Sequence, residues 1–325
     1  MTDAALFVAI PTLPSVRTLI AGRRAARFAD VADALPPADL AAGAEGAGAV
    51  MISARDRIDG AMLAALPSSV RVVATYSVGH DHIDLDAAAA RGIAVVNTPD
   101  VLTDAVAETA MLLLLGAARR VTESVALLRD GRWTGWTPTQ LPGIQVSGRR
   151  LGVFGMGRIG RCIARRARGF DMQIHYHGRR RLAPDEEAGA RWHGDEAAFL
   201  AQCDVLVLAC AANADTRRFL DARRLSLLPP DAVVVNVSRG SVVDDDALIA
   251  GLTTRRVAAA GLDVFNNEPA IDPRYLSLPN AFLLPHIGSS TVTAREQMAV
   301  ALLDALDALD RGETPANLLT PAPCR

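Results

Sequence analysis

A short apolar segment that runs directly into three glycines constrains the fold of this chain more than any other stretch. Leu151–Phe154 is predicted to be a buried strand, a Gly-x-Gly-x-x-Gly pattern follows, and residues 161–170 have a helix-forming composition. In this context the first glycine permits a tight turn, the second lets the backbone approach a pyrophosphate, and the third lets the helix pack on the strand. The helix N-terminus adds unpaired N–H groups and a positive dipole end. A purely structural turn is the alternative, but both flanks favour a dinucleotide site. Its predicted phosphate-binding residues are Gly155, Met156, Gly157, Arg158, Ile159 and Gly160.

Length and composition narrow the class of protein. The chain has 325 residues, which predicts two domains. Half of the residues are hydrophobic, 22% are charged and the net charge is −2, so there is no basic field that would indicate nucleic acid or an anionic membrane as a partner. The cysteines lack metal-ligand spacing, and we expect no metal and a reducing compartment. No signal peptide and no bilayer-length apolar run is present, so we expect a cytoplasmic protein.

Two series of strands alternate with helix-forming segments, which is typical of parallel α/β sheets. The strands predicted in the first series are Leu6–Ile10, Val50–Ser53, Val72–Thr75 and Ala94–Val96. Those predicted in the second are Leu151–Phe154, Gln173–Tyr176, Val205–Leu208, Val233–Val237, Ala258–Gly261 and Phe282–Leu284. The second series has the size of a complete Rossmann domain. A last helix is predicted over 292–310 and can return to the first domain.

One long helix is predicted between the two series, over 103–130, with Thr103 or Asp104 as its N-cap. Residues 111–115 are Met-Leu-Leu-Leu-Leu, which makes its middle apolar on every face. Such a helix is buried all round, either in a core or in a subunit interface. An irregular stretch with two tryptophans, Trp133 and Trp136, follows it.

The residues after the second Rossmann strand indicate which dinucleotide binds. NAD-binding domains place a carboxylate on the ribose 2′-hydroxyl about twenty residues past the glycines. Here the strand is followed by Gly178, Arg179 and Arg180, and no carboxylate occurs before Asp185. Guanidinium groups pair with a 2′-phosphate, whereas a carboxylate would repel it. We therefore predict NADP(H) as the preferred cofactor and leave NAD(H) possible, with a solvated basic loop as the structural alternative.

Three segments at the ends of later strands offer a guanidinium, a carboxylate and an imidazole, in Arg239, Glu268 and His286. Open α/β sheets bind their ligands at these strand ends. When a hydride adds to a carbonyl carbon, the carbonyl oxygen needs a proton, and histidine is the natural donor near neutral pH. A carboxylate on the other ring nitrogen would orient the imidazole. An arginine can hold the carboxylate of the substrate. Taken singly, each has a structural alternative: a capped turn, a loop residue before proline, or an ion pair between Arg239 and Asp244. Together they favour reduction of a carbonyl that neighbours a carboxylate.

The motifs VNVSRGSVVDDDAL, GLDVFNNEP and LPHIGSST, with ATYSVGHDHIDLDAA and NTPDVLTDAVAE upstream, resemble those of the D-isomer-specific 2-hydroxyacid dehydrogenase family. The resemblance covers nearly the whole chain and is greatest to the glyoxylate/hydroxypyruvate reductase branch. It implies that Arg239, Glu268 and His286 are catalytic. It also implies a loop at Val78 and Gly79 whose backbone N–H groups hold the substrate carboxylate, with Arg239 and His286 as further substrate contacts. The further cofactor contacts that it implies are Thr103, Gly178, Arg179, Arg180, Ala211, Val237, Ser238, Asp263 and Gly288.

The resemblance also implies a homodimer, formed through the 103–130 helix and the 131–140 loop. Trp136 or Trp133 of that loop could reach the partner's active site and contact its substrate. Simple packing in the interface is the equal alternative for both tryptophans.

These observations predict a two-domain α/β fold, in which a Rossmann dinucleotide-binding domain (99–288) is inserted into a flavodoxin-like substrate domain (1–98 and 289–325), with the active site in the cleft between them. The expected reaction is NADPH-dependent reduction of a small 2-oxo acid, glyoxylate or hydroxypyruvate, to the D-2-hydroxy acid. The alternatives are a bulkier substrate, such as an aryl pyruvate or 2-ketogluconate, and a dinucleotide-sensing binding protein without catalysis.

Overall fold

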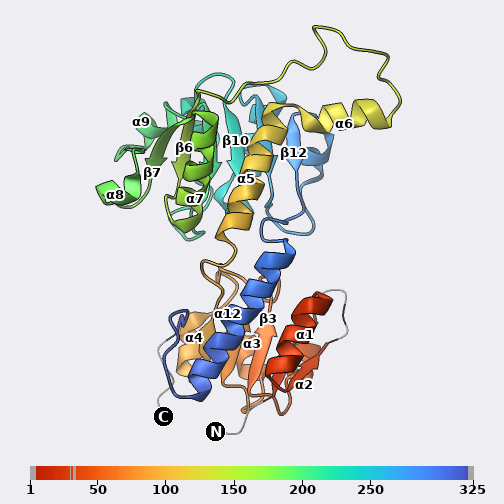
Figure 1. The fold of residues 1–325 in the computed structure, drawn as a ribbon, viewed down its shortest axis with the longest axis vertical. Coiled ribbons are helices and arrows are strands. Elements are labelled where there is room, and N and C mark those ends of the chain that lie inside the picture. Colours follow the sequence, from red (N-terminus) through yellow and green to blue (C-terminus); the bar gives the residue numbers. More distant parts are fainter. Residues whose placement is uncertain (1–4, 30, 32–33, 321–325) are drawn as a thin grey trace. The chain divides into compact units, whose positions relative to one another are not determined.

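Buried runs of valine, isoleucine, leucine and alanine form the strands of two separate parallel sheets (Figure 1). The computed structural model describes residues 5–29, 31 and 34–320. The chain divides into two compact units, one made of residues 1–102 and 289–325 and the other of Thr103–Gly288. The second unit is therefore inserted into the first, and the chain crosses between them after Leu102 and after Gly288.

The first unit is built on a sheet with the strand order β2-β1-β3-β4-β5. Its strands are β1 (Leu6–Val8), β2 (Ala26–Phe28), β3 (Ala49–Ile52), β4 (Val72–Thr75) and β5 (Ala94–Val96), all parallel to their neighbours. Its helices are α1 (Pro14–Arg23), α2 (Pro37–Gly43), α3 (Gly60–Ala65), α4 (Leu85–Ala90) and α12 (Val292–Asp310). This order is that of flavodoxin-like folds, as the sequence predicts.

Strand β2 is the one strand of this sheet that the sequence analysis missed. It lies at the edge of the sheet and its residues are only partly buried. Because its apolar signal is weak, the alternation pattern does not reveal it. The last helix, in contrast, runs over Val292–Asp310, which confirms the predicted range.

The second unit has a sheet of the order β12-β11-β10-β9-β6-β7-β8. Its strands are β6 (Arg150–Phe154), β7 (Gln173–His177), β8 (Arg191–Trp192), β9 (Val205–Leu208), β10 (Val233–Asn236), β11 (Ala259–Leu262) and β12 (Ala281–Leu283). Its helices are α5 (Thr103–Ala118), α6 (Val121–Arg129), α7 (Arg158–Ala167), α8 (Pro184–Glu187), α9 (Glu196–Leu200), α10 (Ala222–Leu227) and α11 (Asp245–Thr253). Counted from β6, this is the Rossmann order 3-2-1-4-5-6 with β12 added at one edge. The predicted strands are confirmed to within a residue at each end, and the short β8 was missed.

Helices cover both faces of this sheet. On one face α5 and α7 lie side by side (Figure 1) and share a core with the side chains of β6 and β10. On the other face α9, α10 and α11 contribute Phe199, Leu225 and Leu248 to a second apolar cluster. The switch point between β6 and β9 therefore lies in the middle of a doubly covered sheet, where such folds bind nucleotides.

The prediction of one long helix over 103–130 is wrong. Helix α5 ends at Ala118, and α6 begins at Val121 after a break at Arg120, whose φ of 56° is left-handed. The Arg120 guanidinium pairs with Glu123 in the first turn of α6, with an Nη2–Oε1 distance of 2.7 Å. Within the single chain Leu112 is 49% exposed, while Leu113 and Leu114 are buried. The core of one subunit therefore does not cover every face of α5, and burial in a subunit interface stays a prediction.

Candidate active site

The glycine turn between β6 and α7 has the geometry of a phosphate cradle. Gly155 has a φ of 98°, and a Cβ there would lie 2.6 Å from the backbone of Cys210. A Cβ on Gly160 would lie 2.2 Å from the carbonyl oxygen of Gly155, whereas one on Gly157 would meet nothing within 4 Å. Gly155 and Gly160 are therefore required by packing, and Gly157 leaves open space in front of the helix.

The N-terminus of α7 has neither a capping side chain nor an acidic residue in its first turn. Gly157 is its N-cap. The first turn of α7 therefore presents backbone N–H groups and a positive dipole end, which suit a pyrophosphate. These features fit a dinucleotide, and the Gly157 to Gly160 segment would hold its phosphates.

The end of β7 is basic. Arg179 and Arg180 are exposed, and neither forms an ion pair with any described residue. Two of the carboxylates further along the chain are already engaged, since Glu187 pairs with Arg181 and Glu186 pairs with Arg161. A Cβ on Gly178 would meet nothing within 4 Å. The loop therefore offers two guanidinium groups beside open space and no carboxylate for a 2′-hydroxyl.

The structure brings Glu268 and His286 together at the ends of β11 and β12. His286 Nδ1 lies 2.6 Å from Glu268 Oε2, and the other carboxylate oxygen of Glu268 accepts a hydrogen bond of 2.7 Å from the Phe265 backbone N–H. The carboxylate is thus fixed by its own loop and in turn fixes the imidazole. His286 itself has a φ of 54°, a left-handed conformation that a residue with a Cβ adopts at an energetic cost.

Burial and pairing act against each other on these carboxyl groups. Burial alone would raise the pKa of Glu268, but the hydrogen bond and charge of His286 outweigh it and hold the pKa below its usual range. Burial raises the pKa of Asp263, although this group accepts hydrogen bonds from the Ile287 and Gly288 backbone N–H groups at 2.8 and 2.7 Å. Asp263 therefore ties β11 to the segment that carries His286.

Arg239 follows β10 in the same unit. Its Nη1 donates to the Ser238 carbonyl at 3.0 Å, and its positive charge helps to lower the pKa of Glu268. Asp244, the alternative partner of Arg239, pairs with Arg218. Arg239, Glu268 and His286 are thus gathered at three neighbouring strand ends.

Asn236 is a residue of this site that the sequence analysis missed. Its Oδ1 accepts hydrogen bonds from the Ser238 N–H and hydroxyl at 3.0 and 2.7 Å, and its Nδ2 donates to the Arg239 carbonyl at 3.0 Å. The buried amide therefore shapes the turn that presents Arg239. An Asn at the end of an otherwise all-valine strand was the available signal.

The remaining predicted cofactor contacts are placed at loops or helix ends of the same unit. Thr103 begins α5, Ala211 follows β9, and Val237 and Ser238 follow β10. The Ala211 carbonyl accepts a hydrogen bond of 2.8 Å from Thr216. Their contact with a dinucleotide stays a prediction.

The predicted substrate loop belongs to the first unit. Val78 and Gly79 follow β4, where the Asn97 side chain donates to the Val78 carbonyl at 2.8 Å and the Ser77 hydroxyl donates to the Gly79 carbonyl at 2.7 Å. Because both carbonyls are held, the loop has a defined shape. In the second unit, Trp133 and Trp136 lie on the long loop after α6 and are 51% and 78% exposed.

Three features define the class of protein as a dinucleotide-dependent oxidoreductase. They are the glycine turn between β6 and α7, the basic loop after β7, and the Arg–Glu–His set at the ends of β10, β11 and β12. Residues 111–288 match the family described as D-isomer specific 2-hydroxyacid dehydrogenase, NAD binding domain. The chain belongs to the D-isomer-specific 2-hydroxyacid dehydrogenase family. This confirms the resemblance, the fold class and the enzyme class that the sequence predicts.

Characterised relatives fall in the expected branch. The chain is 42% identical to a glycerate dehydrogenase of Hyphomicrobium methylovorum over 266 residues, 81% of this chain and 83% of that one. It is 42% identical to a glyoxylate reductase of Thermococcus litoralis over 269 residues, 81% of each chain. A solved NADPH-dependent glyoxylate/hydroxypyruvate reductase of Sinorhizobium meliloti, in complex with NADP and malonate, is 35% identical, with a TM-score of 0.87 over 100% of this chain and 99% of that one.

Within the described part of this chain, no helix is both long and apolar enough to cross a membrane.

Proposed function

We propose that this enzyme reduces glyoxylate and hydroxypyruvate with NADPH and forms the D-2-hydroxy acid wherever a stereocentre results. The bound reduced nicotinamide supplies a hydride to the carbonyl carbon. His286 donates the proton that the carbonyl oxygen needs, and Glu268 stabilises and orients the protonated imidazole. Arg239 holds the substrate's carboxylate or carbonyl oxygen, and the backbone N–H groups of Val78 and Gly79 bind its carboxylate.

The observation that carries this proposal is the 2.6 Å contact between His286 Nδ1 and Glu268. A carboxylate on Nδ1 leaves Nε2 as the proton-donating atom, as general acid catalysis by histidine requires. The His286 side chain is 41% exposed, so Nε2 remains within reach of a substrate. A non-catalytic dinucleotide sensor would not need this arrangement.

The NADP preference is proposed from the loop after β7. Arg179 and Arg180 are exposed and free of ion pairs with described residues, and the neighbouring glutamates are occupied by other arginines. A 2′-phosphate would find guanidinium groups and no competing carboxylate. The relative solved with NADP is consistent with this preference.

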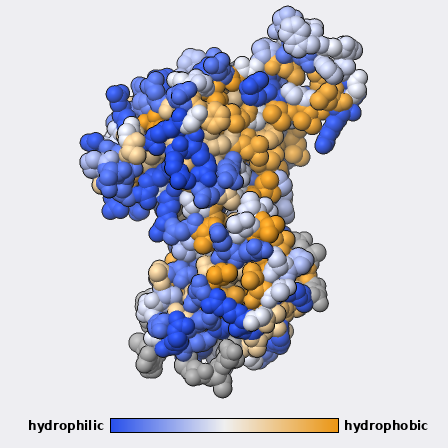
Figure 2. All heavy atoms as spheres, viewed as in Figure 1, coloured by the Kyte–Doolittle hydropathy of each residue, from blue (hydrophilic) through white to orange (hydrophobic). Residues whose placement is uncertain are grey.

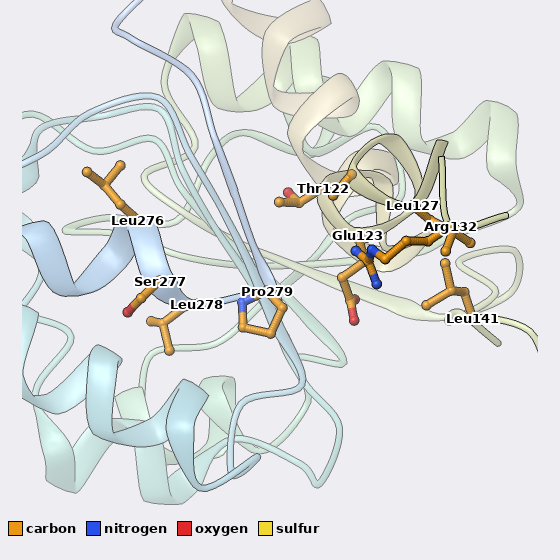
Figure 3. A pocket seen from close by; sticks show the side chains of 10 residues that line it. Thr122, Glu123, Leu127, Arg132, Leu141, Leu276, Ser277, Leu278 and Pro279 are labelled. Atoms are coloured by element: carbon orange, nitrogen blue, oxygen red, sulfur yellow. The ribbon is translucent and has the colours of Figure 1, made fainter. Parts of the chain in front are cut away.

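We further propose a homodimer formed through α5, α6 and the 131–140 loop. Apolar side chains gather over α5 and α6 (Figure 2), and Leu112, Val125 and Leu128 are 49%, 40% and 61% exposed. Beside α6, a hollow of 410 Å³ opens between Leu127 and Leu141 on one side and the 276–279 segment on the other (Figure 3). Apolar surface that gathers on one face marks an interaction site, and a second copy of the chain is the proposed cover. A cytoplasmic location also stays a prediction.

Initial rates of NADPH and NADH oxidation with a panel of 2-oxo acids test the reaction. We expect kcat/KM to be highest for glyoxylate or hydroxypyruvate with NADPH, and the panel includes phenylpyruvate and 2-ketogluconate as the bulkier alternatives. A higher kcat/KM for either bulky acid would replace the proposed substrate. Tight NADPH binding without turnover of any 2-oxo acid would favour the sensor instead.

A further inference from the structure

The first unit has a crevice of its own at the switch point of its sheet. In the order β2-β1-β3-β4-β5, the connection after β1 leads toward one edge of the sheet, and the connection after β3 leads toward the other edge. Connections that diverge in this way leave a crevice at the carboxyl ends of the two strands. A hollow of 490 Å³ lies there, lined by residues that follow β1, β3 and β4 and by the first turn of α12. None of these residues belongs to the Arg–Glu–His set of the second unit.

The lining of this crevice is cationic. Arg55, which follows β3, and Arg295, on α12, are the charged residues among the described residues that line it, and none of those residues is acidic. The lining also has the hydroxyl groups of Thr12, Ser290 and Thr291, whereas the Ser53 hydroxyl donates to the Asp56 carboxylate at 2.9 Å. Two guanidinium groups together with hydroxyl groups make a surface that attracts an anion.

Arg295 is the more informative of the two arginines. Its guanidinium carbon lies 5.8 Å from the centre of the Tyr76 ring, and the Tyr76 hydroxyl donates to the Arg295 backbone carbonyl. No described carboxylate forms an ion pair with Arg295, and burial lowers the pKa of its guanidinium. A half-buried guanidinium that forms no ion pair with a described carboxylate is costly, so an anionic ligand in the crevice would relieve that cost.

The crevice and the proposed substrate loop both include residues that follow β4. Tyr76 lines the crevice and is separated from Val78 only by Ser77, which hydrogen-bonds to the Gly79 carbonyl. A 2-oxo acid whose carboxylate lies on the Val78–Gly79 backbone would therefore have the crevice beside it, in the same unit. Glyoxylate has no side chain to place there.

We propose that this crevice is a side-chain subsite that selects 2-oxo acids with a second anionic group, a carboxylate or a phosphate-like group, held by Arg295 and Arg55. This inference rests on the proposed function, because it assigns the substrate class for that reaction. It predicts that a longer, doubly anionic 2-oxo acid is turned over more efficiently than an uncharged acid of the same length.

Pairs of substrates of equal length measure this selectivity. The charged members are oxaloacetate and 2-oxoglutarate, the uncharged members are 2-oxobutyrate and 2-oxopentanoate, and 2-oxo-4-phosphonobutyrate replaces the distal carboxylate with a phosphate-like group. We expect kcat/KM with NADPH to be about tenfold or more higher for the charged member, as a hydrogen bond to a charged group gives. Whichever of the carboxylate and phosphonate substrates has the higher value identifies the preferred anion.

Substitutions assign the selectivity to the crevice. Arg295→Gln and Arg55→Gln should each lower the charged-to-uncharged ratio of kcat/KM by about tenfold. Arg295→Lys, which keeps the positive charge, should lower the ratio less than Arg295→Gln. Arg71→Gln is the matched control, because Arg71 is exposed in the same unit and does not line the crevice. Thermal unfolding checks that each variant is folded, and Arg55→Gln keeps the test available if Arg295→Gln does not fold.

A binding measurement separates this inference from the proposed function. Calorimetric titration with glutarate, which has no carbonyl to reduce, should show binding to the wild type and weaker binding to Arg295→Gln, whether or not the enzyme turns over 2-oxo acids. Turnover of glyoxylate with equal kcat/KM for charged and uncharged partners would overturn the subsite alone. Failure of the wild type to bind glutarate would also overturn the subsite. If the wild type binds glutarate but turns over no 2-oxo acid, the proposed function alone would be overturned.

Discussion

At the scale of single residues, the site depends on how His286 is held. Its backbone has a φ of 54°, its Nδ1 contacts Glu268, and the following N–H groups bind the buried Asp263. Several hydrogen bonds thus hold a backbone conformation that would otherwise be unfavourable. The consequence is an imidazole with one free nitrogen in a fixed direction, which suits a proton donor.

Glu268→Gln tests the role of this pair through its pH dependence. Because the pKa of Glu268 is lowered in the folded protein, the stabilisation is fully present above the usual glutamate pKa of about 4.3 and is lost as the pH falls through the lower folded value. The wild type should exceed the variant in free energy of unfolding by at most about 1 kcal/mol, since the pair is partly solvated. Urea unfolding should show a larger difference at pH 5.5 than at pH 3.5, and an equal difference at both would contradict the assignment.

Replacing Arg179 and Arg180 together by alanine tests the cofactor preference. Without the guanidinium groups, the dissociation constant for NADPH should rise by about tenfold to hundredfold, as expected for loss of charge-assisted pairs to a phosphate. The constant for NADH should change far less, because NADH has no 2′-phosphate. Fluorescence titration measures both, with Arg191→Ala, an exposed arginine on β8, as the control. Equal losses for the two dinucleotides would refute the assignment.

At the scale of elements, the β6–turn–α7 unit could be predicted in detail, whereas α5 and α6 could not. The glycine spacing demands a tight turn and close packing, and the structure has both. The break between α5 and α6 depends on a left-handed Arg120 and its contact with Glu123. Neither glycine nor proline marks that position, so composition alone predicts an uninterrupted helix.

Two glycine substitutions separate packing from binding in this element. Gly160→Ala would place a methyl group against the Gly155 carbonyl, at 2.2 Å, and should lower the free energy of unfolding of the free enzyme by about 1–3 kcal/mol. Gly157→Ala meets no protein atom within 4 Å and should leave that stability nearly unchanged while weakening NADPH binding. Urea unfolding and fluorescence titration measure the two effects. A destabilised Gly157→Ala, or a stable Gly160→Ala, would contradict the assigned roles.

At the scale of the whole molecule, the alternation of strands and helices predicted both sheets because their strands are buried and rich in valine, isoleucine and alanine. The exposed edge strand β2 and the two-residue β8 lack that signal and were missed. The grouping of Arg239, Glu268 and His286 could be predicted because parallel strands end at one edge of a sheet. Asn236 could not, since its role depends on hydrogen bonds within a single turn.

The proposed dimer makes a prediction at the same scale. Leu112→Asp combined with Leu128→Asp changes two exposed apolar positions, so the subunit should fold while its association is lost through burial of unpaired charges. Light scattering after gel filtration should give a dimeric mass for the wild type and a monomeric mass for the double variant. Val300→Asp, which is exposed on α12, should remain dimeric. A dimer that survives the double substitution would place the interface elsewhere.

The most direct measurement is the single-turnover rate of NADPH oxidation with glyoxylate, comparing the wild type with His286→Ala. If His286 donates the proton during hydride transfer, the rate should fall by about a hundredfold to ten-thousandfold. NADPH should still bind, because the glycine cradle and the arginine loop are untouched. A His286→Ala enzyme that oxidises NADPH at close to the wild-type rate would contradict the account.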